Sequence, residues 1–261
     1  MPIDDTVSYK ETLLLGGPLS AAQKSLQLIE ALAEAGRPLG VSDIARRVGS
    51  ARGTVHKQLA GLIASGWVEQ DLDGRYGLTL KVARLGNAAL EQAGLGQRIH
   101  SLLQQVAARV NETVSIAALG GDAALIIQRA ESSQVLHADI RVGTRVALDG
   151  GASGLVLSTF ALNEAERDEL RSRGIAVAPE EVVTAVERAG VAYTVDKVAS
   201  GISAVSIPLY DSLRFKTVAL TISGPTQRLD PVVAEHALRQ GREHIVQAMS
   251  VAVIGEAARS D

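Results

Sequence analysis

The chain has 261 residues, of which 46% are hydrophobic and 21% are charged, with a formal net charge of −3 and no cysteine. This composition is ordinary for a folded globular protein and excludes a wholly disordered chain, disulfide bonds and thiolate metal sites. The length allows one large domain or two smaller ones, each with its own core.

The distribution of charge separates the front of the chain from the rest. Residues 21–92 hold nine basic and seven acidic residues (9 − 7 = +2), whereas residues 93–261 hold 16 basic and 19 acidic ones (16 − 19 = −3). A positive front on an acidic body favours a polyanion contact at that end. The acidic start and the lack of a long apolar run predict a cytoplasmic protein with no membrane contact.

The first elements expected along the chain are a tail and two helices. Residues 1–19 show no periodicity and are expected to form the tail. Ser20 followed by Gln23 is typical of a capping box, which begins a helix that Gly36 ends. A shorter helix is expected over Asp43–Val48, and Gly49 supplies the turn after it.

A third helix and a hairpin follow. Ser50 is the expected cap of the helix, whose apolar stripe includes Val55 and Leu59 at helical spacing. The run W-V-E-Q, the turn D-L-D-G and the run R-Y-G-L then predict a β-hairpin. Two short helices around a glycine turn form a helix-turn-helix pattern, and with the first helix and the hairpin they predict a winged helix.

The remainder of the chain mixes helices and strands without strict alternation, which predicts an α+β fold. A connecting helix is expected from Thr79 and an amphipathic one over 99–110. Further strands are expected over 113–119, 124–130, 135–140, 191–195, 202–209 and 216–222, with helices near 152–161, 163–173, 180–189 and 231–253.

The candidate DNA-binding residues lie at the start of the third helix and around it. Arginine can pair with guanine, glutamine with adenine, and small side chains can touch the thymine methyl group, while basic residues contact phosphates. A solvated helix face is the alternative explanation for such polar residues. The predicted DNA contacts are Ser42, Arg46, Arg47, Ser50, Ala51, Arg52, Thr54, Val55, His56, Lys57, Gln58 and Arg75.

The segment S-D-I-A-R-R-V-G-S-A-R-G-T-V-H-K-Q-L-A-G-L-I-A-S-G-W-V-E, followed by G-R-Y-G-L and L-G-N-A-A-L, resembles the DNA-binding domain of the IclR family of bacterial transcription regulators. The likeness continues in V-G-T-R-V-A-L, A-S-G, A-G-V-A-Y, G-I-S-A-V-S-I-P-L and A-L-T-I-S-G-P, and spans residues 20–253. It implies a winged helix joined by a linker helix to a GAF-like effector-binding domain. It also implies a homodimer or dimer of dimers on a palindromic operator, with repression favoured over activation.

On this resemblance the expected domains are a tail (1–19), the winged helix-turn-helix (20–78), the linker helix (79–93), the effector-binding domain (94–255) and a second tail (256–261). The resemblance also implies an effector pocket. Its residues here would be Ala152, Ser153, Gly154, Thr194, Ala204, Thr221 and Ser223.

The expected pocket departs from the family pattern. Asp149 replaces a common histidine, Leu155 a lysine, Ala204 a cysteine and Thr194 an acidic residue. Free N–H groups at the start of the helix near 152 could hold an anion. A larger, less polar pocket predicts a small organic acid with an apolar body, for example an aromatic acid. The alternative is that Thr194 and Ala204 only pack the sheet and nothing small is bound.

Two other functions were weighed against a DNA-binding regulator. G-A-S-G-L at 151–155 is similar to the hydrolase motif G-x-S-x-G, but Leu155 occupies the place of the last glycine. The five histidines are scattered, so we predict no catalytic residues, no metal site and no cofactor. A winged helix that binds another protein, without a small-molecule response, remains the second alternative.

Overall fold

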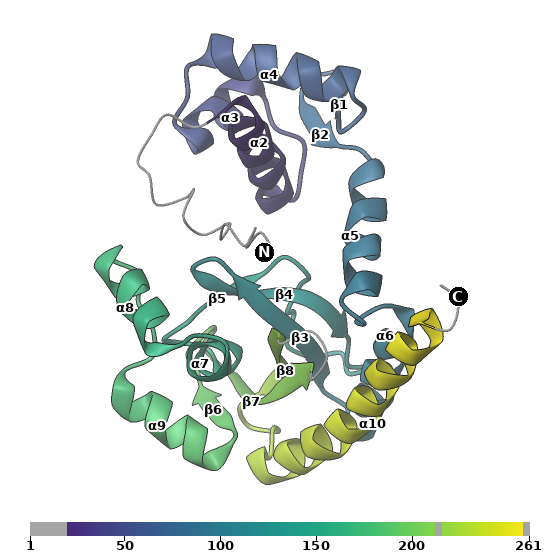
Figure 1. The fold of residues 1–261 in the computed structure, drawn as a ribbon, viewed down its shortest axis with the longest axis vertical. Helices are drawn as coiled ribbons and strands as arrows, with labels where there is room; N and C mark the ends of the chain where they lie inside the picture. The colour runs from purple at the N-terminus through teal and green to yellow at the C-terminus, as the bar shows by residue number, and fades with distance from the viewer. Residues whose placement is uncertain (1–19, 212–215, 258–261) are drawn as a thin grey trace, which may run out of the picture. The chain divides into compact units, whose positions relative to one another are not determined.

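A computed structural model describes residues 20–211 and 216–257 of the chain. The chain divides into two compact units, Met1–Gly86 and Asn87–Asp261, and the boundary falls inside helix α5 (Lys81–Gln92). Each unit has its own core (Figure 1). The predicted 1–19 tail and the last four residues of the predicted 256–261 tail lie outside the described residues.

The first unit packs three helices and a small hairpin around one core. The helices are α2 (Ala21–Ala35), α3 (Val41–Val48) and α4 (Arg52–Ala64), and strand β1 (Val68–Gln70) pairs antiparallel with β2 (Tyr76–Leu78). The capping box predicted at the start of α2 is confirmed, and α2 ends at Gly36, whose φ of 62° suits glycine. The fully buried core residues include Leu28, Leu39, Ile44, Val55 and Leu59.

The starts of α3 and α4 differ from the expectation. Helix α3 begins at Val41 with Gly40 as its N-cap, two residues before the predicted start. Helix α4 has Ala51 as its N-cap, and no side chain caps it. The predicted Ser50 cap is wrong because the backbone N–H of Ser50 donates to the carbonyl of Ala45, which makes it part of the turn after α3.

The second unit is built on a six-stranded antiparallel sheet in the order β5-β4-β3-β8-β7-β6. The strands are β3 (Thr113–Gly120), β4 (Ala123–Ala130), β5 (Arg145–Ala147), β6 (Ala192–Val195), β7 (Ile202–Asp211) and β8 (Lys216–Pro225). The predicted strand over 135–140 is absent. Val135 and Leu136 are exposed there, and the additional strand is the short β5, paired to the edge of β4.

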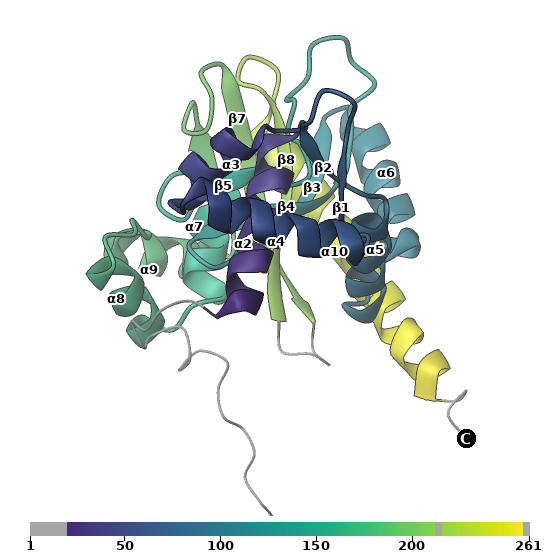
Figure 2. The same ribbon diagram turned by 90° about the horizontal axis from the view of Figure 1, so that it is seen from above.

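Helices cover both faces of this sheet (Figures 1 and 2). On one face lie α6 (Gln97–Val110) and α10 (Pro231–Ala257), which bury a core with Leu103, Ile207 and Leu220. On the other face lie α7 (Ala152–Phe160), α8 (Glu164–Ser172) and α9 (Glu180–Ala189), which share a core with Ala117 and Val156. The predicted α+β fold is confirmed.

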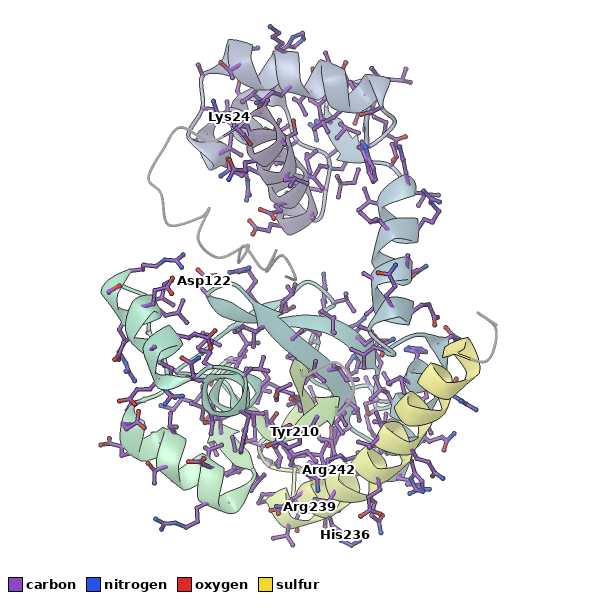
Figure 3. All side chains as sticks on the ribbon, viewed as in Figure 1. Lys24, Asp122, Tyr210, His236, Arg239 and Arg242 are labelled. Carbon is purple, nitrogen blue, oxygen red and sulfur yellow. The ribbon has the colours of Figure 1, made fainter. Side chains whose placement is uncertain are left out.

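Polar side-chain contacts join α10 to the end of α9, and β5 to the β3–β4 turn. Arg239 on α10, labelled in Figure 3, pairs with Glu235 and donates to the carbonyl of Ala189 at the end of α9. Arg145 on β5 forms an ion pair with Asp122 at the β3–β4 turn. These contacts connect elements that are distant in the sequence.

Candidate functional site

Helix α4 presents an exposed basic face at its N-terminal end. Arg52, Thr54, His56 and Lys57 are all exposed, and Ala51 is exposed directly before them. The thirteen residues of α4 contain no Asp or Glu. Because nothing acidic on the helix competes for these cations, this face is suited to an anionic partner such as a phosphate backbone.

Two of the residues predicted to contact DNA on this helix are covered to different degrees. Val55 is fully buried in the core of the first unit. The prediction that Val55 contacts DNA is therefore wrong, because its side chain belongs to the apolar stripe that holds α4 on α2 and α3. Gln58 is half-buried.

The polar residues before α4 lie on α3 and on the turn. Ser42, Arg46 and Arg47 are exposed, whereas Ser50 is half-buried. Arg46 forms an ion pair with Asp43, at 2.6 Å between Nη2 and Oδ1. An exposed pair of this kind is weak, so Arg46 can exchange its carboxylate for a phosphate at little cost.

The hairpin presents Arg75 and is fixed to the start of α5. The side chain of Arg75 is exposed, and its backbone N–H donates to Asp71, which also organises the turn. Lys81 donates to the carbonyl of Ser65 at 2.8 Å and lies 4.2 Å from the centre of the Trp67 ring. Lys81 was missed by the sequence analysis, since its partners are 14 and 16 positions away.

The second unit contains a cavity between the sheet and the start of α7. Its volume is about 20 Å³, roughly the space needed for one water molecule. Six of the seven predicted effector-binding residues line it: Ala152, Ser153, Thr194, Ala204, Thr221 and Ser223. The sequence analysis missed Ser115, Ile126, Ile140, Val146, Val198 and Ile202.

The floor of the cavity consists of hydroxyl groups placed by the strand register. Thr194 on β6 is opposite Ala204 on β7, which is opposite Ser223 on β8. In the neighbouring row, Thr221 on β8 is opposite Ser115 on β3. None of the described residues that line the cavity is charged. The floor can therefore offer hydrogen bonds to a polar ligand but no full counter-charge.

The start of α7 forms a wall of the cavity. Gly151 is the N-cap, no side chain caps the helix, and Ala152 and Ser153 are buried beside the cavity. Backbone N–H groups in the first turn of a helix lack intrahelical partners and favour an anion. This wall can therefore supply the positive potential that the side chains lack.

Gly154 does not line the cavity, although the sequence analysis placed it among the binding residues. A Cβ atom at this position would lie 1.9 Å from the carbonyl oxygen of Ala147. Its lack of a side chain therefore allows α7 to pack directly on the backbone at the end of β5.

The Ile140 wall of the cavity is held by a cluster of ion pairs. The guanidinium of Arg129 donates to the carbonyl of Ile140 at 2.7 Å and pairs with Asp139 and Glu131. Hydrogen bonds from Arg141, helped by Arg129, hold the pKa of Asp139 below its usual value. Asp139 therefore keeps its negative charge, and its ion pairs in this cluster, to lower pH than an unpaired aspartate would.

Other kinds of site were also considered. Within residues 20–211 and 216–257, no group of three or more His, Asp or Glu side chains could hold a metal ion. In the same described part of the chain, no helix is both long enough and apolar enough to cross a membrane.

A winged helix with an exposed basic helix, joined in one chain to a sheet domain with a small cavity lined by hydroxyl groups and apolar side chains, defines the class of ligand-responsive DNA-binding regulators. Comparison with known families agrees. Residues 21–72 match the IclR helix-turn-helix domain, and residues 87–250 match the C-terminal domain of the bacterial transcriptional regulator IclR. The chain belongs to the IclR family of transcription regulators. It is a DNA-binding regulator with an effector-binding domain, not an enzyme.

Individual relatives cover most of the chain. A glycerol operon regulatory protein of Streptomyces griseus is 30% identical over 226 residues, covering 82% of this chain and 87% of the relative. The crystal structure of Pseudomonas aeruginosa HmgR is 27% identical, with a TM-score of 0.70, and covers 88% of this chain and 98% of its own. An IclR homologue from Microbacterium hydrocarbonoxydans, complexed with 4-hydroxybenzoate, has the same fold at 21% identity, with a TM-score of 0.73 and coverage of 89% and 100%.

Proposed function

We propose that this chain is a cytoplasmic repressor that binds a palindromic operator as a homodimer or dimer of dimers. In this proposal, a small organic acid with an apolar or aromatic body binds in the cavity beside α7 and changes the affinity for DNA. The observation that carries the DNA-binding part is the exposed face of α4, which combines Arg52, His56 and Lys57 with no carboxylate on the helix.

Each exposed residue has a role in the proposed DNA complex. Arg52, Thr54 and Gln58 contact base edges in the major groove, where Arg pairs with guanine and Gln with adenine. Arg46, Arg47 and His56 contact phosphates, together with Lys57 and, from the hairpin, Arg75. Ser42 in the first turn of α3 and Ser50 in the turn before α4 contact the DNA backbone, and Ala51, the N-cap of α4, touches a base methyl group.

A dimer is proposed because one winged helix contacts too little DNA for operator specificity. Two copies must then be held at half-sites one or more helical turns apart. Helix α5 has no buried residue in the single chain, and Leu85 on it is exposed. Covering this apolar side chain in a second copy gives α5 a role as spacer and dimer contact.

The effector chemistry follows from what lines the cavity. Hydroxyl groups of Thr194, Thr221 and Ser223 and the first N–H groups of α7 can bind a carboxylate. The remaining wall is largely apolar, with Ile126 and Val146 among its residues. The Microbacterium homologue that is complexed with 4-hydroxybenzoate supports an aromatic acid in this fold.

The DNA-binding part is tested by incubating the purified chain with fragments of the genome and sequencing the recovered DNA. We expect enrichment of a promoter fragment that contains an inverted repeat. Recovery of fragments at background level at low ionic strength, with and without organic acids, would contradict the proposal. The recovered promoter also identifies the genes under control.

The effector part is tested by thermal-shift measurements with paired compounds. Benzoate and 4-hydroxybenzoate should raise the melting temperature, whereas benzamide, which lacks the negative charge, should not. Ser223→Ala should reduce the shift, and Ser101→Ala, which changes an exposed serine on α6 outside the cavity, should not. Stabilisation only by small acids such as glyoxylate and pyruvate would contradict an apolar effector body. An active ligand should change DNA affinity by about 1–3 kcal/mol.

A further inference from the structure

The cavity beside α7 is too small for the proposed ligand in the conformation described. Its volume of about 20 Å³ is close to what one water molecule requires. Any organic acid must therefore displace part of the wall before it can enter. The question is which part of the wall can move.

Most of the wall is held by regular secondary structure. Ten of the twelve lining residues belong to strands β3 to β8 or to α7. Only Ile140 and Val198 stand outside helices and strands. These two side chains are therefore the candidates for a movable wall.

The backbone around Ile140 is fixed on both sides. Arg129 donates to the carbonyl of Ile140 and is itself ion-paired. Further along, the N–H of Gly143 donates to the carbonyl of Ile126 at 2.8 Å, and the N–H of Ile126 donates to Thr144 at 2.9 Å. Moving Ile140 would break several of these interactions at once.

The loop that carries Val198, Asp196–Gly201, is held only near its ends. Oδ1 of Asp196 accepts from the N–H of Gly201 at 2.8 Å and from Oγ1 of Thr226 at 3.1 Å. The N–H of Ile202 donates to Ala199 at 3.1 Å. Within the described part of the chain, Lys197, Val198 and Ser200 make no hydrogen bond. Val198 is 46% exposed while its side chain lines the cavity.

We infer that the Asp196–Gly201 loop is the gate of the effector cavity and that Val198 is the plug that controls entry and limits ligand size. Its role for an effector rests on the function proposed above. The gate itself is a property of the loop and can be measured without any ligand. Opening the loop does not require other elements to unfold, because Ala199 is the one residue of 197–200 with a hydrogen bond in the described part of the chain, and that bond lies at the end of the loop.

The anchors give this loop two discrete hinge points. Asp196 has a φ of 55° and Gly201 a φ of 78°, so both lie in the left-handed region. An aspartate tolerates that region better than most residues, and here its carboxylate also accepts the two hydrogen bonds that close the loop. Weakening this carboxylate should therefore open the gate more often.

The natural chain has no cysteine, so one introduced thiol can report on entry. Ala204→Cys places the thiol on the cavity floor, where position 204 is 9% exposed. Reaction with a small thiol reagent such as methyl methanethiosulfonate then proceeds only through open molecules. Ser223→Cys is a second reporter on the same floor, for use if the first variant does not fold.

We expect Val198→Ala to raise the labelling rate of the buried thiol roughly threefold to tenfold, because it removes two half-buried methyl groups that hold the gate closed. The matched control is Val195→Ala. Val195 is 41% exposed, lies three residues away and does not line the cavity, so its change should leave the rate unaltered. Melting temperatures of all variants are compared first, to exclude general unfolding.

Two further variants separate the gate from its alternatives. Asp196→Ala should raise the labelling rate, whereas Asp196→Asn keeps an oxygen acceptor and should change it little. If Ile140→Ala raises the rate and Val198→Ala does not, the gate lies at the other wall and the inference is overturned. Equal rates in all variants would overturn it as well.

The labelling result and the ligand result can fail separately. If no organic acid raises the melting temperature, the proposed effector is contradicted. A labelling rate that depends on Val198 would still support the gate. Conversely, benzoate could raise the melting temperature of the wild type while Val198→Ala leaves the labelling rate unchanged. That result would support the proposed effector and contradict the proposed gate.

Discussion

Arg52 is the single side chain on which the proposed base recognition depends most. It is the first residue of α4 and is exposed, and neither a hydrogen bond nor an ion pair engages it in the described part of the chain. We expect Arg52→Ala to weaken operator binding by roughly 1–3 kcal/mol if the guanidinium reads a base. Fluorescence anisotropy on the recovered promoter fragment measures the change.

The control for this variant is Arg37→Ala, which removes the same charge from an exposed position in the turn after α2. Its effect on operator affinity should be small. Equal losses for the two variants would show that only net charge matters and would remove Arg52 as a base contact.

Gly154 illustrates a residue whose sequence motif suggests ligand binding while its environment shows a packing role. Because a Cβ there would overlap the carbonyl oxygen of Ala147, Gly154→Ala should lower the free energy of unfolding by roughly 3 kcal/mol or more. Gly150→Ala is the matched control, since its Cβ would lie 3.7 Å from the Ala147 side chain, an ordinary contact. Chemical denaturation of the two variants should therefore give clearly different midpoints.

At the scale of single residues, the sequence predicted which side chains are buried or exposed better than it predicted which of them bind a ligand or DNA. The helical stripe correctly placed Val55 on the apolar side of α4, yet Val55 was also expected at the DNA because it lies near the start of that helix. A residue cannot satisfy both expectations, and the fully buried side chain decides for packing. Val198 carried no signal at all, since an exposed valine in a loop has no pattern that points to a cavity.

At the scale of elements, the contact between Glu112, directly before β3, and Arg228, between β8 and α10, joins segments that are 116 residues apart. The guanidinium of Arg228 forms two hydrogen bonds to the carboxylate, at 2.5 and 2.9 Å, and a third to the carbonyl of Leu136. The bonds to Glu112 raise the pKa of Arg228 above its ordinary value. Gly224 makes room for this pair, because a Cβ there would lie 2.5 Å from the Glu112 carboxyl group.

We expect Arg228→Ala to lower the free energy of unfolding, because it leaves the buried carboxylate of Glu112 without its cation. The loss falls below that of a fully buried pair because the Arg228 side chain is 39% exposed. Adding Glu112→Gln to Arg228→Ala should recover part of the loss, since the unpaired charge is then removed. A double variant no more stable than Arg228→Ala would contradict this account.

Elements with strong local signals were predicted well, and those defined by tertiary contacts were not. The capping box of α2 and the periodic stripes of the long helices are local, so their positions followed from the sequence. Strand β5 has only three residues and exists because it pairs with β4, whereas the apolar residues of 135–140 remain unpaired. The cavity floor needed the strand order β3-β8-β7-β6, which places Ser115 beside Thr221 and which no local pattern reveals.

At the scale of the whole molecule, a chain with a net charge of −3 is proposed to bind a polyanion. This is possible because binding depends on the local field, and solvent ions screen charges more than about 8 Å away at physiological salt. The net negative charge of residues 93–261 disfavours binding of nucleic acid to that part of the chain. Specific recognition must come from the few exposed side chains of the first unit.

The exposed basic side chains of the first unit give a prediction about the salt dependence of binding, which also distinguishes DNA from a protein partner. Binding constants for duplex DNA should fall by about 0.9 of a log unit per log unit of salt for each phosphate neutralised. Lys57→Gln should reduce that slope by about 0.9, because it removes one exposed phosphate contact, whereas Arg37→Gln should leave it unchanged. Anisotropy titrations of the promoter fragment over a range of potassium chloride concentrations provide the slopes. If association were insensitive to salt, a winged helix that binds another protein would explain the exposed face of α4 better than an operator would.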